Sequence, residues 1–125
     1  MGIVVGYRAT PEGKAALKYA LELAAEKATR LIVVSANRKG PSPADNQELQ
    51  DLLNGSGVDH ELMEIVGDYD PAEEILEAAS EQNAELVVIG MRRRTPVGKL
   101  FMGSTAQRIL LEAECPVLAI KANRH

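Results

Sequence analysis

Short apolar runs rich in Val, Ile and Leu recur along the chain and predict five β-strands. Most of these runs are almost continuously apolar, which is typical of parallel strands covered by helices on both faces. The third run alternates apolar and polar residues, which predicts a more exposed strand. The predicted strands are residues 2–7, 30–36, 60–66, 85–90 and 115–121.

Segments with the apolar spacing of amphipathic helices lie between these strands. The first begins at Thr10-Pro11, where the threonine can cap the helix and the proline suits its first position. Another begins at Asp70-Pro71, with Glu73 completing a variant of the capping box. The other two helices are expected over residues 46–54 and from about 104 to 114.

The alternation of strands and helices predicts an α/β fold. We expect one domain over residues 1–125, with an open, five-stranded parallel sheet and helices on both faces, in a Rossmann-like arrangement. Crossovers in such sheets are right-handed. Ligands bind beyond the carboxyl ends of the strands, where the strand order reverses.

Composition and charge argue against nucleic acid as a partner. Aromatic residues make up only 3% of the chain, so few side chains could stack on bases. The net charge is −4, and the positive charge is concentrated in residues 90–104, which hold Arg92, Arg93, Arg94 and Lys99 and no acid. Outside this segment 10 basic residues face 18 acidic ones. Such a local cationic spot suits a small anion better than a long polyanion.

The remaining composition points to a cytoplasmic protein. Cys115 is the single cysteine, so no intrachain disulfide can form. The apolar runs are far shorter than the roughly 20 residues that span a bilayer, and no signal-peptide pattern opens the chain. The sequence therefore predicts no membrane partner, and no metal-ligand spacing is present.

The glycine- and arginine-rich segment after the fourth predicted strand is the candidate site. It fits neither a P-loop nor a dinucleotide fingerprint, because Gly98-Lys99 is followed by Leu100 and the glycine spacing is wrong. Gly103 and Ser104 open the last predicted helix, and a helix N-terminus can bind an anion. The hydroxyls of Ser104 and Thr105 could bind that anion or cap the helix.

The chain resembles the universal stress protein family over essentially its whole length, above all in residues 85–120. Nucleotide-binding members carry glycine, two residues, glycine, nine residues, glycine and then Ser or Thr. Gly90, Gly103 and Ser104 match this motif, whereas Arg93 stands at the second glycine. Members also usually have an aspartate after the first strand, where this chain has Arg8.

The resemblance implies strand order 3-2-1-4-5 and a crevice between the loops after strands one and four. It implies binding of ATP, with or without Mg²⁺, in that crevice. It also implies a homodimer through the last strand, over Val117–Ile120, which is apolar enough to need cover at a sheet edge. The expected nucleotide-binding residues are Arg8, Ala36, Gly90, Arg92, Arg93, Gly98, Gly103, Ser104 and Thr105.

Several alternatives stay open at this point. Arg93 could hold phosphate by bidentate bonds or could fill the site and block it. Arg8 could contact the ligand or pair with Glu12. If the site is empty, the protein would be a dimeric interaction module without nucleotide. A weak ATPase would need a metal-holding acid and a water-orienting group near the loop, and the sequence has neither there, so a non-catalytic protein is favoured.

Overall fold

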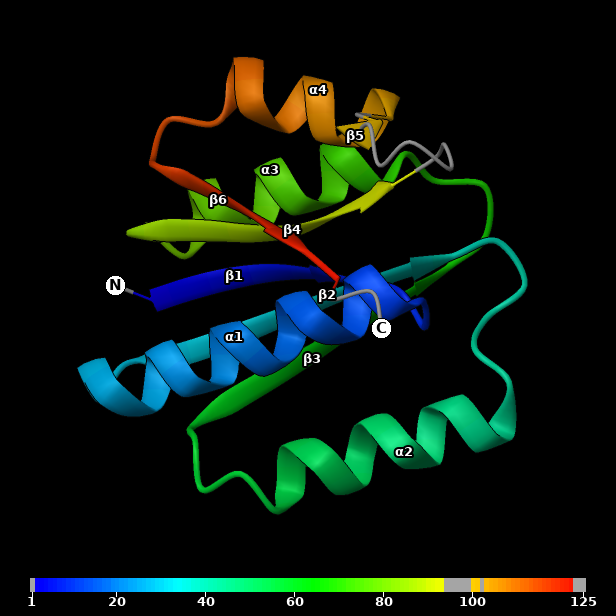
Figure 1. Cartoon of the computed structure of the whole chain (residues 1–125), viewed down its shortest axis with the longest axis vertical. Coiled ribbons are helices and arrows are strands. Elements are labelled where there is room, and N and C mark those ends of the chain that lie inside the picture. The colour runs from blue at the N-terminus through cyan, green and yellow to red at the C-terminus, as the bar shows by residue number, and fades with distance from the viewer. Residues whose placement is uncertain (1, 94–99, 102, 123–125) are drawn as a thin grey trace.

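The computed structural model describes residues 2–93, 100–101 and 103–122, and these form six strands and four helices (Figure 1). In chain order they are β1 (Gly2–Tyr7), α1 (Pro11–Lys27), β2 (Arg30–Asn37), α2 (Pro43–Asn54), β3 (His60–Val66), α3 (Pro71–Glu81), β4 (Leu86–Arg93), β5 (Leu100–Phe101), α4 (Ser104–Glu112) and β6 (Val117–Lys121).

The five long strands form one parallel sheet in the order β3-β2-β1-β4-β6. This confirms the expected order 3-2-1-4-5, with β6 as the fifth of the predicted strands. One feature was not expected. The fourth predicted strand does not end at Gly90 but continues to Arg93, where Arg92 pairs with Phe101 of β5 in a short antiparallel ribbon.

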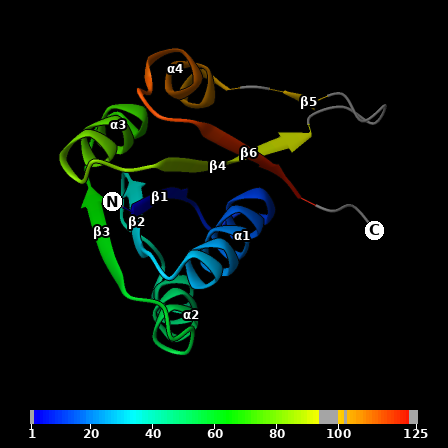
Figure 2. The ribbon, with the colours of Figure 1, turned by 90° about the vertical axis from the view of Figure 1, so that its left-hand side faces the viewer.

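Two helical layers cover the sheet, with α1 and α2 on one face and α3 and α4 on the other (Figure 2). Because strand side chains alternate between faces, Ile3 and Val5 of β1 pack under α1 while Val4 packs under α3. Both cores are built from aliphatic side chains, as the low aromatic content requires. No helix in the described ranges has the length and apolar character that a membrane span needs.

The helix ends follow their local sequence. Thr10 Oγ1 accepts a hydrogen bond from the Gly13 N–H at 3.1 Å, and Asp70 Oδ1 accepts one from the Ala72 N–H at 3.0 Å. Ser42 caps α2 in the same way, so that helix begins at Pro43, earlier than the predicted residue 46. Helix α1 ends at Ala28, which adopts a left-handed conformation with φ of 52°.

Helix α4 begins differently from the other three described helices. Its N-cap is Gly103, which has no side chain, so among the described residues α4 lacks the side-chain cap that the other helices have. Capping was one of the two roles considered for Ser104 and Thr105, and the structure does not assign it to either hydroxyl. The first turn of α4 also lacks an acidic residue, whereas α1, α2 and α3 each carry at least one there.

Candidate functional site

A cleft of about 290 Å³ opens at the carboxyl end of the sheet. Its walls come from the ends of β1, β2 and β4 and from the first turns of α1, α3 and α4. After β1 the chain passes to β2 on one side, whereas β4 lies on the other side of β1. The cleft therefore lies at the reversal of strand order, where open parallel sheets bind ligands.

The cleft brings together residues that the sequence separates by almost a hundred positions. The predicted site residues in its lining are Arg8, Ala36, Gly90, Gly103, Ser104 and Thr105. Arg92 and Arg93 belong to β4, where the structure describes their backbone but not their side chains. Gly98 lies outside the described residues. Six of the nine expected residues thus share one cleft, and their contact with a ligand stays a prediction.

The lining also contains residues that the sequence reasoning did not select. Val34, Ile75, Ile89 and Ile109 form an apolar wall, and Glu12 lies in the first turn of α1. The apolar residues were expected only in the core. A signal for them was available, because residues at or just before the carboxyl ends of neighbouring parallel strands necessarily meet at one edge of the sheet.

Close approach of backbone segments explains two of the glycines in the cleft wall. A Cβ added at Gly90 would lie 2.5 Å from the carbonyl oxygen of Glu12, so the first turn of α1 packs directly on β4. A Cβ at Gly13 would lie 2.0 Å from the carbonyl oxygen of Arg8. Gly90, expected from the motif as a ligand residue, therefore also has a packing role that needs no ligand.

The first turn of α4 is the part of the cleft best suited to bind an anion. The first N–H groups of any helix lack intrahelical partners, and the helix dipole makes this end positive. Here Gly103, Ser104 and Thr105 line the cleft, the N-cap Gly103 offers no capping side chain, and the first turn itself contains no acid. A phosphate or carboxylate can bind at such an end.

Arg108, in the middle of α4, ties this helix to the start of α3. Its Nη1 donates a hydrogen bond to Asp70 Oδ2 at 2.6 Å, and its Nε donates one to Glu112 Oε2 at 3.0 Å. Asp70 is also the N-cap of α3, so one carboxylate caps α3 and ties it to the middle of α4, and both helices border the cleft. The neighbouring carboxylates raise the pKa of Arg108, which keeps it charged at any ordinary pH.

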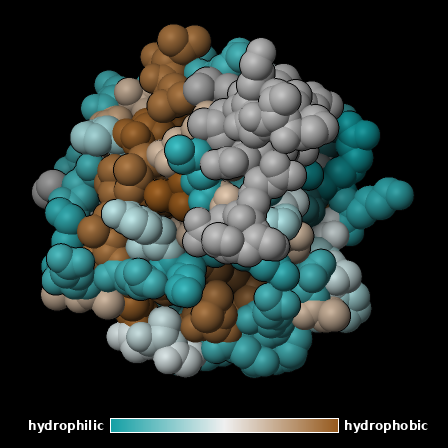
Figure 3. Space-filling model, viewed as in Figure 1, coloured by the Kyte–Doolittle hydropathy of each residue, from teal (hydrophilic) through white to brown (hydrophobic). Residues whose placement is uncertain are grey.

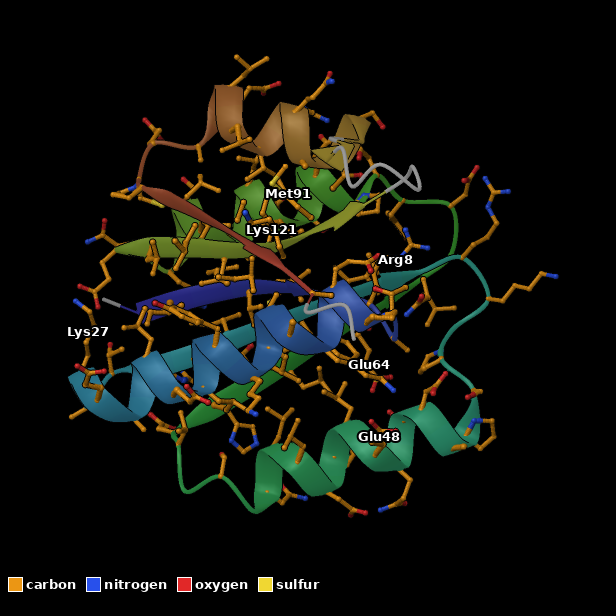
Figure 4. The ribbon with its side chains drawn as sticks, in the orientation of Figure 1. Arg8, Lys27, Glu48, Glu64, Met91 and Lys121 are labelled. Atoms are coloured by element: carbon orange, nitrogen blue, oxygen red, sulfur yellow. The ribbon has the colours of Figure 1, made fainter. Side chains whose placement is uncertain are left out.

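Two opposite charges lie in the described lining of the cleft. Arg8 is exposed, Glu12 is half-buried, and both come from the segment where β1 leads into α1. The salt bridge between them, one of the alternatives from the sequence, is not formed. Figure 4 shows Arg8 at the carboxyl end of the sheet, close to the start of α1.

Tyr7 is the aromatic residue in the described lining, and it is almost fully buried. Burial raises the pKa of its phenol, and the nearby Lys14 only partly opposes this. The phenol therefore keeps its proton at neutral pH and acts as a neutral wall rather than as a base.

An apolar surface lies away from the cleft, over α4 and β6. Leu111 of α4 is 84% exposed and Leu110 is 40% exposed, and Figure 3 shows apolar side chains gathered over this part of the molecule. The neighbouring strand β6 pairs with β4 along one edge, and no strand among the described residues pairs with its other edge. Residues 117–120 of β6 are half-buried.

Together, the strand order and the cleft define an α/β protein of the doubly wound, parallel-sheet class with a ligand cleft at the switch point. The model of the Universal stress protein family matches residues 1–121. A universal stress protein of Mycolicibacterium smegmatis is 46% identical over 127 residues, covering 95% of this chain and 96% of the relative. The chain belongs to the universal stress protein family.

Solved structures agree with this assignment. The structure of a universal stress protein from Archaeoglobus fulgidus is similar with a TM-score of 0.75 and 30% identity, covering 97% of this chain and 98% of that one. The structure of the universal stress protein from Archaeoglobus fulgidus in complex with dAMP gives a TM-score of 0.69 and 25% identity, with 97% and 98% coverage.

Proposed function

We propose that this universal stress protein is a small cytoplasmic regulator that binds ATP or a related adenine nucleotide in the cleft at the carboxyl end of the sheet. One observation carries the proposal. The uncapped, acid-free N-terminus of α4 opens directly into a cleft at the switch point of the sheet. The dAMP complex of the related Archaeoglobus fulgidus protein supports a nucleotide as the anion.

The shape of the cleft supports a definite orientation for that nucleotide. The 5′-phosphates bind at the first turn of α4, where Ser104 and Thr105 add hydroxyl donors to the backbone N–H groups. The base packs against the apolar wall and reaches the backbone of Ala36 at the end of β2. In this orientation Arg92 and Arg93 follow Gly90 on β4 and remain candidate phosphate ligands.

Any magnesium would arrive with the nucleotide. No group of three potential metal ligands occurs among the described residues, so the chain offers no ready-made metal site there. Mg²⁺ commonly binds through substrate phosphates and few protein groups, which is compatible with this cleft. We therefore expect ATP to bind with Mg²⁺ held mainly by its phosphates.

The decisive experiment places a negative charge where the phosphate would bind. Thr105→Asp puts a carboxylate at the second position of α4, where the helix dipole stabilises the negative charge but the charge repels a phosphate. Ala44→Asp is a matched control, because Ala44 is exposed at the second position of α2 and outside the cleft. Calorimetric titration of nucleotide-stripped protein with ATP and Mg²⁺ should show at least tenfold weaker binding for Thr105→Asp and unchanged binding for Ala44→Asp.

Arg93→Gly in the same titration decides between the two roles of this arginine. If the wild type binds and the variant binds more weakly, Arg93 is a phosphate ligand. If only the variant binds, Arg93 closes the site, and a nucleotide-free function follows. A wild type and variants that all fail to bind ATP and AMP would refute the proposed function.

A second candidate function is a dimeric interaction module. It is favoured by the edge of β6 that no described strand covers and by the exposed Leu111 on α4. The dimer would form by edge-to-edge pairing over Val117–Ile120, because an uncovered apolar edge strand pairs readily. Sedimentation velocity should show a dimer at micromolar concentration, weakened by Leu111→Glu but not by the exposed α1 control Lys18→Glu. Only monomer in the wild type would contradict this interface.

A further inference from the structure

Arg8 is a cation without an ion-pair partner among the described residues, and it lies at the centre of the carboxyl edge of the sheet. We propose that Arg8 recognises a second phosphate on the ribose of the ligand, an inference that rests on the proposed nucleotide site. The cleft would then prefer an adenine nucleotide that carries phosphate on both the 5′ oxygen and the 2′ or 3′ oxygen.

The first argument is the isolation of the Arg8 side chain. It makes no hydrogen bond or ion pair with any described residue, although Glu12 lies in the same cleft wall. The other arginines whose side chains the structure describes all pair with carboxylates: Arg30 with Asp59 and Glu61, Arg38 with Asp68, and Arg108 with Asp70, Glu73 and Glu112. In the described part of this acidic chain, Arg8 alone keeps its guanidinium available.

The second argument is its place along the ligand. The strands at the cleft run in the order β2-β1-β4. A nucleotide with its base near Ala36 of β2 and its 5′-phosphate at α4, beyond β4, has its ribose opposite the end of β1. Arg8 is the residue that directly follows β1 and lines the cleft there. In dinucleotide-binding α/β sheets an acidic residue about 20 residues beyond the phosphate-binding turn contacts the ribose 2′-OH, and an arginine nearby accommodates a 2′-phosphate, so an arginine facing a ribose is chemically suited to this role.

The third argument is the separation of the two anion-binding positions. Arg8 leads into α1, and its carbonyl oxygen packs against Gly13 of that helix. Helix α4 lies on the opposite face of the sheet with α3 (Figure 2). The two positions therefore flank the cleft from opposite faces, and a ligand with two separated phosphates fits both better than one with a single phosphate. Guanidinium binds phosphate through two parallel charge-assisted bonds.

Isomeric ligands test the inference with the same atoms in different arrangements, and Arg8→Gln separates a specific contact from the roughly one additional negative charge of the bisphosphates. Adenosine 5′-diphosphate, adenosine 2′,5′-bisphosphate and adenosine 3′,5′-bisphosphate carry the same two phosphates in different places. We would titrate each, and AMP, into stripped wild-type protein, Arg8→Gln and the control Lys18→Gln, whose lysine is exposed on α1 outside the cleft. The wild type and Lys18→Gln should bind one bisphosphate about tenfold or more tightly than the 5′-diphosphate. Arg8→Gln should lose that preference while its affinity for AMP changes less than about threefold.

The outcomes separate this inference from the function on which it rests. If AMP and ADP bind but neither bisphosphate is preferred, the nucleotide site stands and the ribose-phosphate inference is wrong. If Arg8→Gln weakens ADP as much as the bisphosphates, Arg8 serves the 5′ chain instead, and the inference is again wrong. If no adenine nucleotide binds at all, both fail. A preference that Arg8→Gln removes, with circular dichroism unchanged, supports it, and comparison of the two bisphosphates then tells which oxygen carries the phosphate.

Discussion

Gly90→Ala should destabilise the protein because β4 and α1 touch at this glycine. The added methyl would lie 2.5 Å from the carbonyl oxygen of Glu12 and 2.7 Å from its carbonyl carbon. Carbon atoms do not approach backbone atoms this closely, and the obstacle is backbone in the first turn of α1 rather than the end of a flexible side chain. Helix α1 must therefore move away from the sheet, or β4 must shift.

The size of the effect follows from this overlap. Overpacking in a tight interior typically costs about 1–3 kcal/mol of unfolding free energy. With a urea m-value of about 2 kcal/mol per molar, the unfolding midpoint falls by roughly 0.5–1.5 M. For a chain of this length the same loss lowers the Tm by roughly 3–12 °C. Helix α1 spans Pro11–Lys27 and packs on β1 and β4, so the shift spreads through a large part of one core.

Urea unfolding followed by circular dichroism measures this loss. The matched control is Gly55→Ala, because Gly55 ends α2 with an ordinary φ of −84° and its added Cβ would lie 3.2 Å from the nearest atom, the Asp51 carbonyl oxygen. The control should stay within about 1 kcal/mol of wild type, with reduced chain entropy of the unfolded state acting in its favour. An unchanged midpoint for Gly90→Ala would refute the packing argument and return Gly90 to a role in ligand contact alone.

Three further predictions concern stability and reactivity. Ala28→Gly should raise the unfolding free energy by up to about 1 kcal/mol, because Ala28 has a φ of 52°, which glycine adopts more readily than alanine. The control Ala25→Gly, on the exposed side of α1, should lower the unfolding free energy by a similar amount. Urea midpoints measure both changes, and a destabilised Ala28→Gly would contradict the strain argument. Asp70→Ala should lower the unfolding free energy by about 1 kcal/mol, because α3 loses its N-cap. A double-mutant cycle with Arg108→Gln should show a coupling energy of under about 1 kcal/mol, because the ion pair is partly exposed. Strict additivity of the two changes would mean that the ion pair contributes nothing. Burial raises the pKa of the Cys115 thiol, so a smaller fraction of this thiol is deprotonated at a given pH. Iodoacetamide should therefore alkylate Cys115 more slowly than free cysteine at pH 7.5. An equal or faster rate would show that the thiol is accessible and activated.

The order of the helices and strands could be predicted from the sequence because the apolar spacing and the capping residues indicated the same elements. Apolar runs mark the strands, and Thr10, Asp70 and the prolines that follow them mark two helix starts at the residues where the structure has them. The weak helix α2 was placed three residues late because its start depends on the capping by Ser42, not on apolar spacing. The short strand β5 could not be predicted, because its two apolar residues are too few to show a strand pattern and it forms by pairing with the extended β4.

The cleft could be predicted only in part. The positions after strands one and four were expected at one edge of the sheet, and six of the nine expected residues line the cleft there. The role of Gly90 in packing could not be read from the sequence, because it depends on the approach of Glu12 from another element. The isolation of Arg8 could not be read either, since a glutamate four residues away on the chain is a natural partner in sequence but not in this geometry.

Most of the cleft lining comes from two distant parts of the chain, residues 6–13 on one side and residues 89–91 and 103–109 on the other. Strand β6 is held by its pairing with β4, and its Leu118 and Ile120 also pack on the core beneath α1, so β6 can separate from the sheet only by leaving both neighbours. A molecule bound across the cleft would hold β4 in place and so oppose that separation. Occupancy should therefore slow amide hydrogen exchange in β6, whose residues 119–121 pair with the cleft-lining residues 89–91 of β4.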